Sequence, residues 1–181
     1  MAKDRKIDLV ILGLLSHEDL TGYDIKKHID GAINFFWKGS FGSIYPALNA
    51  MEGAGQITKY KAEESGNREK IYYHITDSGI EVLKSWISSE QASNELKYET
   101  LLKLYFGGVQ GPEITLRNID AFEQKVKGDL ELLKMYKENL EKAGDNEDHV
   151  YFLLTVMFGI ETYGAYLKWC AQARKMLKQI R

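Results

Sequence analysis

The residues of this sequence that could do chemistry gather between Ser40 and Ile57, and they suit contact with a polyanion better than catalysis. In this stretch Ile44, Leu48 and Met51 recur at spacings of four and three, which predicts a short helix seated on a core by one apolar side. The positions predicted to face solvent carry small or hydrogen-bonding side chains: Ser43, Tyr45, Ala47 and Asn49. No carboxylate occurs before Glu52, so this side of the helix can approach a polyanion.

Pro46 indicates where this helix begins. Proline lacks an N–H group and fits best in the first helical turn, which places the start near Gly42 or Ser43. The free N–H groups and the positive end of the helix dipole then point outward, an arrangement that suits a phosphate. The alternative is an ordinary amphipathic core helix, and this stretch alone leaves both interpretations open.

The overall charge does not favour a strongly basic nucleic-acid binder. The formal net charge is −2, with 28% charged and 44% hydrophobic residues, which is typical of a soluble protein. Binding requires a local basic face rather than a basic total. We expect Lys26, Lys27 and His28, together with Arg68 and Lys70, to supply such a face.

Other chemistry finds no support in the spacing of the residues. No histidine lies three or four residues from another, so a helix-borne metal site is unsupported, and the glycines do not follow a nucleotide-binding order. Cys170 is the only cysteine, which excludes an intramolecular disulfide and a cysteine-cluster zinc site. We therefore expect no catalytic residues, no metal and no cofactor, and we do not expect an enzyme.

The first half of the chain predicts the elements that would position this helix. Apolar residues from Ile7 to Leu15 follow the spacing of an amphipathic helix, and Ile25, Ile29 and Ile33 mark a second helix capped by Asp19 or Thr21. After the helix at 43–53, the runs ITKYKAEE and KIYYHIT are joined by SGNR, which predicts a hairpin. Helices followed by a hairpin are the order of a winged helix-turn-helix domain.

The second half predicts a helical domain. A fourth helix follows Thr76 with Ile80, Leu83 and Ile87 on its buried side, and the polar segment 88–95 reads as a linker, so we place the domains at 1–92 and 93–181. Pro112 opens a helix with a seven-residue apolar repeat, which indicates a helical hairpin.

The final helix, about 148–177, is apolar nearly all round in its first turns, which predicts a partner chain and most simply a homodimer. The predicted dimer interface consists of Leu153, Met157, Ile160, Tyr163 and Leu167. The N-terminus has no apolar core of signal-peptide type, and the strongly apolar run 150–160 is too short to span a bilayer. We therefore expect a cytoplasmic protein without a membrane partner.

Aromatic residues are abundant near both predicted domains, and two explanations stay open. A small aromatic or hydrophobic effector would bind where the domains meet, or the rings simply pack the core and the dimer. The effector-binding residues under the first explanation are Phe36, Trp37, Tyr163 and Trp169.

Four segments resemble the PadR family of bacterial transcriptional regulators, whose C-terminal half is similar to that of the virulence activator AphA. They are GSIYPALNAMEGAGQI, KIYYHITDSG, LLKLYFGG and FGIETYGAYLKWCAQA. The resemblance implies a winged-helix head, a tail that dimerises through its last helix, and repression relieved by a small effector, a phenolic acid in the founding proteins. It also implies that Ser43 and Tyr45 face DNA and that Arg68 and Lys70 are wing contacts. Phe41 and the Glu63–Glu64 pair depart from the basic residues often found in the family.

The sequence thus predicts a mostly α protein (α+β), with a winged helix-turn-helix domain followed by an all-helical dimerisation domain. The predicted function is that of a dimeric repressor that binds a double-stranded DNA operator and is released by a hydrophobic or phenolic effector. The alternative is a helical protein-interaction adaptor without DNA binding. The predicted DNA-binding residues are Lys26, Lys27, Ser40, Ser43, Tyr45, Asn49, Arg68 and Lys70.

Overall fold

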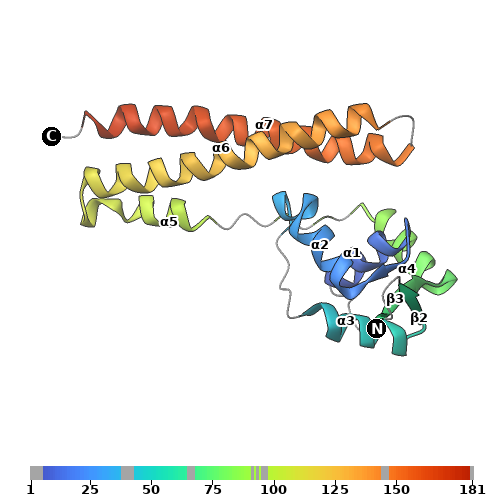
Figure 1. Cartoon of the computed structure of the whole chain (residues 1–181). Helices are drawn as coiled ribbons and strands as arrows, with labels where there is room; N and C mark the ends of the chain where they lie inside the picture. The colour runs from blue at the N-terminus through green and yellow to red at the C-terminus, as the bar shows by residue number, and fades with distance from the viewer. Residues whose placement is uncertain are drawn as a thin grey trace. The chain divides into compact units, whose positions relative to one another are not determined.

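The chain folds into two compact units, Met1–Ser93 and Asn94–Arg181, in the computed structural model shown in Figure 1. The structure describes residues 6–37, 43–64, 68–90, 92, 94, 98–143 and 147–179. The fold class expected from the sequence is confirmed: the first unit is a winged helix-turn-helix and the second is helical. The domain boundary between 92 and 93 stays a prediction.

The N-terminal unit combines helices with a small sheet. Its elements are α1 (Lys6–Leu15), β1 (Leu20–Thr21), α2 (Gly22–Asp30), η1 (Ala32–Phe35), α3 (Ile44–Gly53), β2 (Ile57–Glu64), β3 (Arg68–Ile75) and α4 (Asp77–Ile87). The strands are antiparallel in the order β1-β3-β2. The hairpin β2–β3, called the wing below, pairs Ile57 with Ile75 at its base and Glu64 with Arg68 at its far end.

One apolar core holds these elements together. Ile11 and Leu12 of α1, Ile25 of α2 and Leu48 of α3 are completely buried and belong to the same cluster. Burial of a large aliphatic side chain contributes about 1.5–3 kcal/mol, so these contacts fix α2 and α3 to α1. Ile57 at the base of the wing joins the same core.

The start of α4 is anchored to the turn that follows α3. The Thr76 hydroxyl caps α4 by accepting from the Gly79 N–H at 3.2 Å, and donates to the carbonyl of Gly55 at 2.7 Å. Gly55 itself has a φ of 71°, which glycine adopts without strain. A Cβ at Gly79 would lie 2.2 Å from the backbone oxygen of Gln56, so only glycine fits where α4 crosses this turn.

The C-terminal unit is a long helical hairpin with a short third helix. It contains α5 (Glu99–Tyr105), η3 (Gly107–Val109), α6 (Pro112–Lys142) and α7 (Glu147–Leu177). Figure 1 shows α6 and α7 lying side by side along their length, with α5 beside the first half of α6. Ile119, Val126 and Leu133 of the seven-residue repeat are buried between the helices, as the sequence predicts. Gly159 allows the close approach, since a Cβ there would lie 2.9 Å from Leu133 Cδ1.

Three local expectations were wrong, and one short strand was missed. The helix α2 ends at Asp30, and Ile33 lies in the short helix η1 instead of continuing it. Ala47 is buried rather than exposed, because it lies on the same side of α3 as Ile44 and Leu48. Ile87 is 67% exposed, because the core ends one turn earlier at Leu83. The strand β1 was not predicted at all, since two residues are too few to show an alternating pattern.

The helix α7 is long and apolar enough to cross a membrane, as judged by length and composition over Asp148–Leu177. The sequence analysis considered only the strongly apolar run 150–160, which by itself is too short to span a bilayer. A single such helix is weak support for a membrane span, because the core helix of a soluble protein meets the same criterion.

Candidate nucleic-acid interface

The helix α3 presents one buried and one exposed side. Ile44, Leu48 and Met51 are at most 2% exposed, whereas Tyr45 is 61% exposed and Asn49 also faces solvent. Ser43 is half-buried at the N-terminal boundary, and Pro46 occupies the third helical position, where its missing N–H has no intrahelical partner to lose. The helix therefore offers hydrogen-bonding side chains on the side opposite the core, and the backbone N–H groups of its first turn point along the axis at its N-terminal end.

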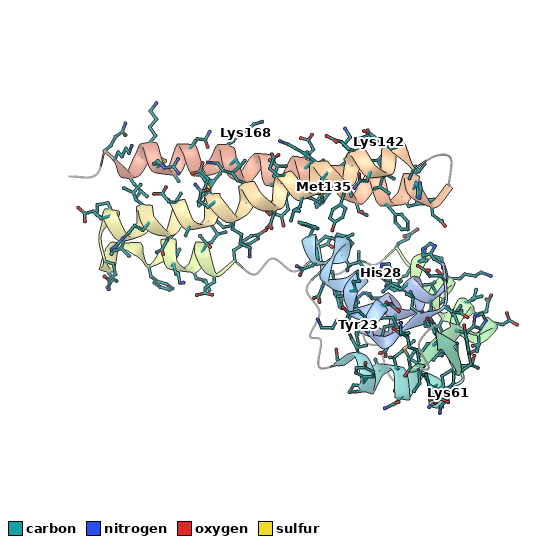
Figure 2. The ribbon with its side chains drawn as sticks, in the orientation of Figure 1. Tyr23, His28, Lys61, Met135, Lys142 and Lys168 are labelled. Carbon is teal, nitrogen blue, oxygen red and sulfur yellow. The ribbon has the colours of Figure 1, made fainter. Side chains whose placement is uncertain are left out.

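The lysines of the wing are partly neutralised by neighbouring carboxylates. Lys59 Nζ lies 2.7 Å from Glu52 at the end of α3, and this bond raises the lysine's pKa. Lys61, labelled in Figure 2, lies 2.6 Å from Glu69 across the hairpin. Lys70 is half-buried on β3. The wing thus has less uncompensated positive charge than its lysine content indicates.

The predicted basic residues of α2 are exposed. Lys26 donates to Asp30 at 2.7 Å, which raises the lysine's pKa, while Lys27 lies in the last turn of the helix. His28 Nε2 is 3.9 Å from a Glu18 oxygen. Figure 2 shows Tyr23 and His28 on α2, in the same unit as Lys61. A cationic side chain with one surface partner exchanges that partner easily, because an exposed ion pair contributes only about 0–1 kcal/mol.

Asp19 links the wing to the segment before α2. Its carboxylate accepts from the Tyr60 hydroxyl at 2.8 Å and contacts His74 Nδ1 at 2.7 Å. The bond to His74 is the main reason that the pKa of Asp19 lies below its ordinary value, followed by the bond to Tyr60. Tyr60 in turn stacks on Tyr72, with ring centroids 5.7 Å apart. Sequence reasoning missed this cluster, because Asp19 was considered only as a helix cap.

The predicted DNA-binding residues all belong to the N-terminal unit, but the structure does not describe every one. Ser40 lies outside the described residues. Arg68 is described only by its backbone, as the first residue of β3 paired with Glu64. The helix α3 packs against both α2 and β2 in the same core, so the elements that carry the remaining predicted residues are held together. These remaining residues are Lys26, Lys27, Ser43, Tyr45, Asn49 and Lys70.

The aromatic residues proposed for an effector lie in two separate packing environments. Trp37 packs on the core of the N-terminal unit, and Phe36 beside it is 57% exposed. In the C-terminal unit Trp169 meets Phe122 edge-on at 6.2 Å, and Tyr163 meets Tyr166 at 5.7 Å.

Half-buried phenols line this second cluster. Burial raises the pKa of Tyr163 to about 12. Burial also raises the pKa of Tyr98, and so does its hydrogen bond with Tyr166. These hydroxyls are therefore neutral at physiological pH and can take part in hydrogen bonds only as uncharged groups.

The residues predicted for a dimer interface are mostly half-buried within the chain. Leu153, Ile160, Tyr163 and Leu167 lie toward the α6 side of α7, whereas Met157 is 46% exposed. More apolar surface lies on the opposite side of the first half of α7. We call this set the tail patch: Val150, Tyr151, Leu154, Met157 and Phe158.

Among the described residues no group of three or more His, Cys, Asp or Glu side chains is placed to hold a metal ion. Cys170 is buried, and burial raises the pKa of its thiol, which keeps it protonated.

Helices, an outward-facing third helix and a β-hairpin define a winged helix-turn-helix regulator with a helical C-terminal region. Residues 11–85 match the PadR-like family of transcriptional regulators, and residues 96–178 match the C-terminal domain of the virulence activator alpha. The chain thus combines a PadR-like domain with a C-terminal domain of the virulence-activator type, which confirms the resemblance found in the sequence.

Individual relatives agree with this assignment. The chain is 36% identical to the negative transcriptional regulator PadR of Bacillus subtilis over 103 residues. This aligned segment covers 56% of this chain and 57% of that protein. The matched segments span about half the length of the curated relatives. The crystal structure of Bacillus subtilis PadR in complex with operator DNA has a TM-score of 0.82 and 28% identity, covering 96% of this chain and 99% of that one. Its complex with p-coumaric acid has a TM-score of 0.74 and 27% identity, covering 97% and 100%.

We predict that Asp19→Asn lowers the free energy of unfolding at pH 7 by roughly 1 kcal/mol, because Tyr60 and His74 lose a charged acceptor on a partly exposed site. The pKa of Asp19 is lowered in the folded state, so its stabilisation is present above the ordinary pKa of aspartate and is lost as the pH falls through the folded value. The difference between wild type and Asp19→Asn should therefore shrink toward pH 3. Urea unfolding across this pH range measures it.

Glu81→Gln is the matched control, since Glu81 pairs with Lys84 on the exposed side of α4 and should change stability little. A difference between wild type and Asp19→Asn that stays constant from pH 7 to pH 3 would contradict a stabilising role for the Asp19 charge.

Proposed function

We propose that the protein is a dimeric, DNA-binding transcriptional repressor that acts in the cytoplasm and is released from its operator by a small phenolic or hydrophobic molecule. The observation that carries this proposal is the exposed side of α3, where Tyr45 and Asn49 face solvent above a completely buried stripe. The similarity to a PadR solved in complex with operator DNA supports DNA as the partner.

In this proposal α3 enters the major groove. Tyr45 and Asn49 reach base edges, and Ser43 with the first N–H groups of the helix meets a phosphate. Arg68 and Lys70 of the wing bind the adjacent backbone, and Lys26, Lys27 and Ser40 add phosphate contacts. The two classes of contact have different consequences, because phosphate contacts position the protein and base contacts select the sequence.

Repression follows from occupancy alone, since a protein bound over a promoter blocks polymerase without catalysing a reaction. We therefore propose no enzymatic activity. A helical adaptor that binds a protein partner and no DNA is the alternative, and DNA selection separates the two.

We predict that wild-type protein enriches a specific duplex from a random DNA library. On that duplex Tyr45→Ala should weaken binding about tenfold or more, because a recognition side chain contributes on the order of 1–3 kcal/mol. Asn49→Ala should mainly relax base preference. Arg68→Ala should weaken binding to all duplexes alike and reduce the slope of log K against log salt by about one.

Lys84→Ala on α4 is the control for a lost lysine away from the proposed surface, and it should bind as wild type does. Folded Tyr45→Ala protein with unchanged operator affinity would show that α3 does not read DNA. Failure of the wild type to enrich any duplex would favour the adaptor.

The proposed dimer rests on the tail patch. Phe158 and Tyr151 are each 68% exposed, and Leu154 is 59% exposed, all on one side of α7. A hairpin of two helices buries one stripe of each helix, so an all-round apolar helix needs a further partner. Identical chains related by a two-fold axis use the same patch twice, and they place two heads on two half-sites. Of the residues that the sequence predicts for this interface, Met157 belongs to the tail patch, while Leu153, Ile160, Tyr163 and Leu167 lie toward α6 and stay a separate part of the proposal.

We predict that Phe158→Asp converts the dimer to monomers, because a carboxylate placed in the patch would lose its hydration on association. Sedimentation velocity measures the change. Met176→Asp is a matched control: Met176 is 69% exposed on the same helix but lies outside the patch. A Phe158→Asp protein that remains as dimeric as Met176→Asp would move the interface elsewhere.

We further propose Phe36, Trp37, Tyr163 and Trp169 as the effector-binding residues. Their rings offer apolar surface, and the neutral phenol of Tyr163 can hydrogen-bond a ligand. The similarity to a PadR bound to p-coumaric acid supports this class of ligand. An effector weakens DNA binding only by its differential affinity for the two states, so tenfold release requires about 1.4 kcal/mol.

We predict that p-coumaric acid releases the selected duplex and changes tryptophan fluorescence over the same concentration range. Trp37→Phe and Trp169→Phe should shift the release to higher concentrations, while Trp86→Phe, on α4 outside the proposed site, should not. A fluorescence change without release would identify the binding as adventitious.

A further inference from the structure

The phenol end of Tyr45 lies directly on the backbone of Gly22, the first residue of α2. A Cβ built at Gly22 would be 2.9 Å from Tyr45 Cε1 and 3.1 Å from both its Cζ and its hydroxyl oxygen. Contacts of this length are shorter than van der Waals packing allows, so the space that a side chain would occupy at Gly22 is filled by the tyrosine. Tyr45 is therefore exposed and yet supported along one edge of its ring.

The backbone of Gly22 is held in place from two directions. Thr21 and Asp24 form a capping box at the start of α2: the Asp24 N–H donates to Thr21 Oγ1 at 3.2 Å, and the Thr21 N–H donates to Asp24 Oδ2 at 3.3 Å. The Thr21 hydroxyl also donates to Asp24 Oδ2, at 2.6 Å. Thr21 also pairs with Tyr72 in the sheet. The surface on which Tyr45 rests is thus part of the rigid frame of the unit.

The site differs from Gly79 in what a new side chain would strike. At Gly79 the nearest atom is a backbone oxygen, which cannot move without disturbing the fold. At Gly22 all three nearest atoms belong to the far end of the Tyr45 side chain, which can swing away by rotation about χ1. A methyl group at Gly22 is therefore expected to displace the ring and to leave the backbone unchanged.

We infer that Gly22 is a positioning residue for DNA recognition: its missing side chain sets where the Tyr45 phenol is presented to the major groove. The inference rests on the proposed function, in which Tyr45 contacts DNA. Gly22 has no side chain that could contact a base. The inference therefore makes it a determinant of specificity that acts only through Tyr45.

Gly22→Ala tests this, with Gly13→Ala as the matched control. Gly13 lies within α1, and a Cβ there would meet nothing within 4 Å. Both variants should fold, because alanine is the better helix former. On the duplex selected by wild-type protein, Gly22→Ala should bind about tenfold more weakly, whereas Gly13→Ala should change affinity by less than about twofold.

A double-mutant cycle shows whether the effect passes through the ring. In a Tyr45→Ala background there is no ring to displace, so adding Gly22→Ala should cause no further loss. An equal loss in both backgrounds, or no loss in either, overturns the inference.

A second measurement does not depend on DNA. In free protein with labelled tyrosine and glycine, nuclear Overhauser effects should join the Tyr45 ring protons to the Gly22 α-protons, and Gly22→Ala should shift the ring resonances while Gly13→Ala does not. Absence of these effects overturns the inference by itself. If the contact is present but the wild type selects no duplex, the proposed function fails instead.

Discussion

The antiparallel pairing of β1 with β3 is the interaction on which the N-terminal unit depends. Only Leu20 and Thr21 form this strand, opposite Tyr73 and Tyr72. Asp19 immediately before it binds two wing side chains, and Gly22 immediately after it supports Tyr45. Four consecutive residues thus connect the wing, the start of α2 and the exposed side of α3, so these elements cannot shift independently.

The distribution of charge explains how a nearly neutral protein can present a nucleic-acid surface. Acidic residues do not lie at random on the N-terminal unit: Glu52 pairs with Lys59, Glu69 with Lys61, and Asp30 with Lys26. Each of these exposed pairs is weak enough for a phosphate to replace the carboxylate, since both anions suit an ammonium group. Such an exchange gives little net electrostatic gain, so affinity in the proposed complex depends more on α3 and on dimerisation than on total charge.

Much of the fold was predictable because its signals are local. Periodicity placed α1, α3 and α6, while β-forming runs and a turn signal placed the wing. Thr76 and Pro112 marked helix starts that the structure retains, and of the two caps considered for α2 the structure uses Thr21. What could not be predicted depends on contacts between distant residues. Asp19 meets His74 from 55 positions away, and no spacing rule connects them. Ala47 was misplaced because the buried side of α3 is wider than its large apolar residues alone indicate. In the predicted site, the exposure of Tyr45 and Asn49 followed from the apolar pattern of α3. The contact between Tyr45 and Gly22 could not be predicted, because a glycine in a sequence does not indicate which distant side chain packs on its backbone.

The C-terminal unit contains more apolar surface than its own fold buries. The helix α6 covers one side of α7 and encloses Val156 and Cys170, while α5 lies beside the first half of α6 only. The tail patch, on the first half of α7, faces away from both helices within this unit. Under the proposed dimer, burial of this patch makes the stability of the tail depend on protein concentration. Assembly and DNA binding then reinforce each other, because a chain that has lost its partner loses both the cover on α7 and the second set of DNA contacts.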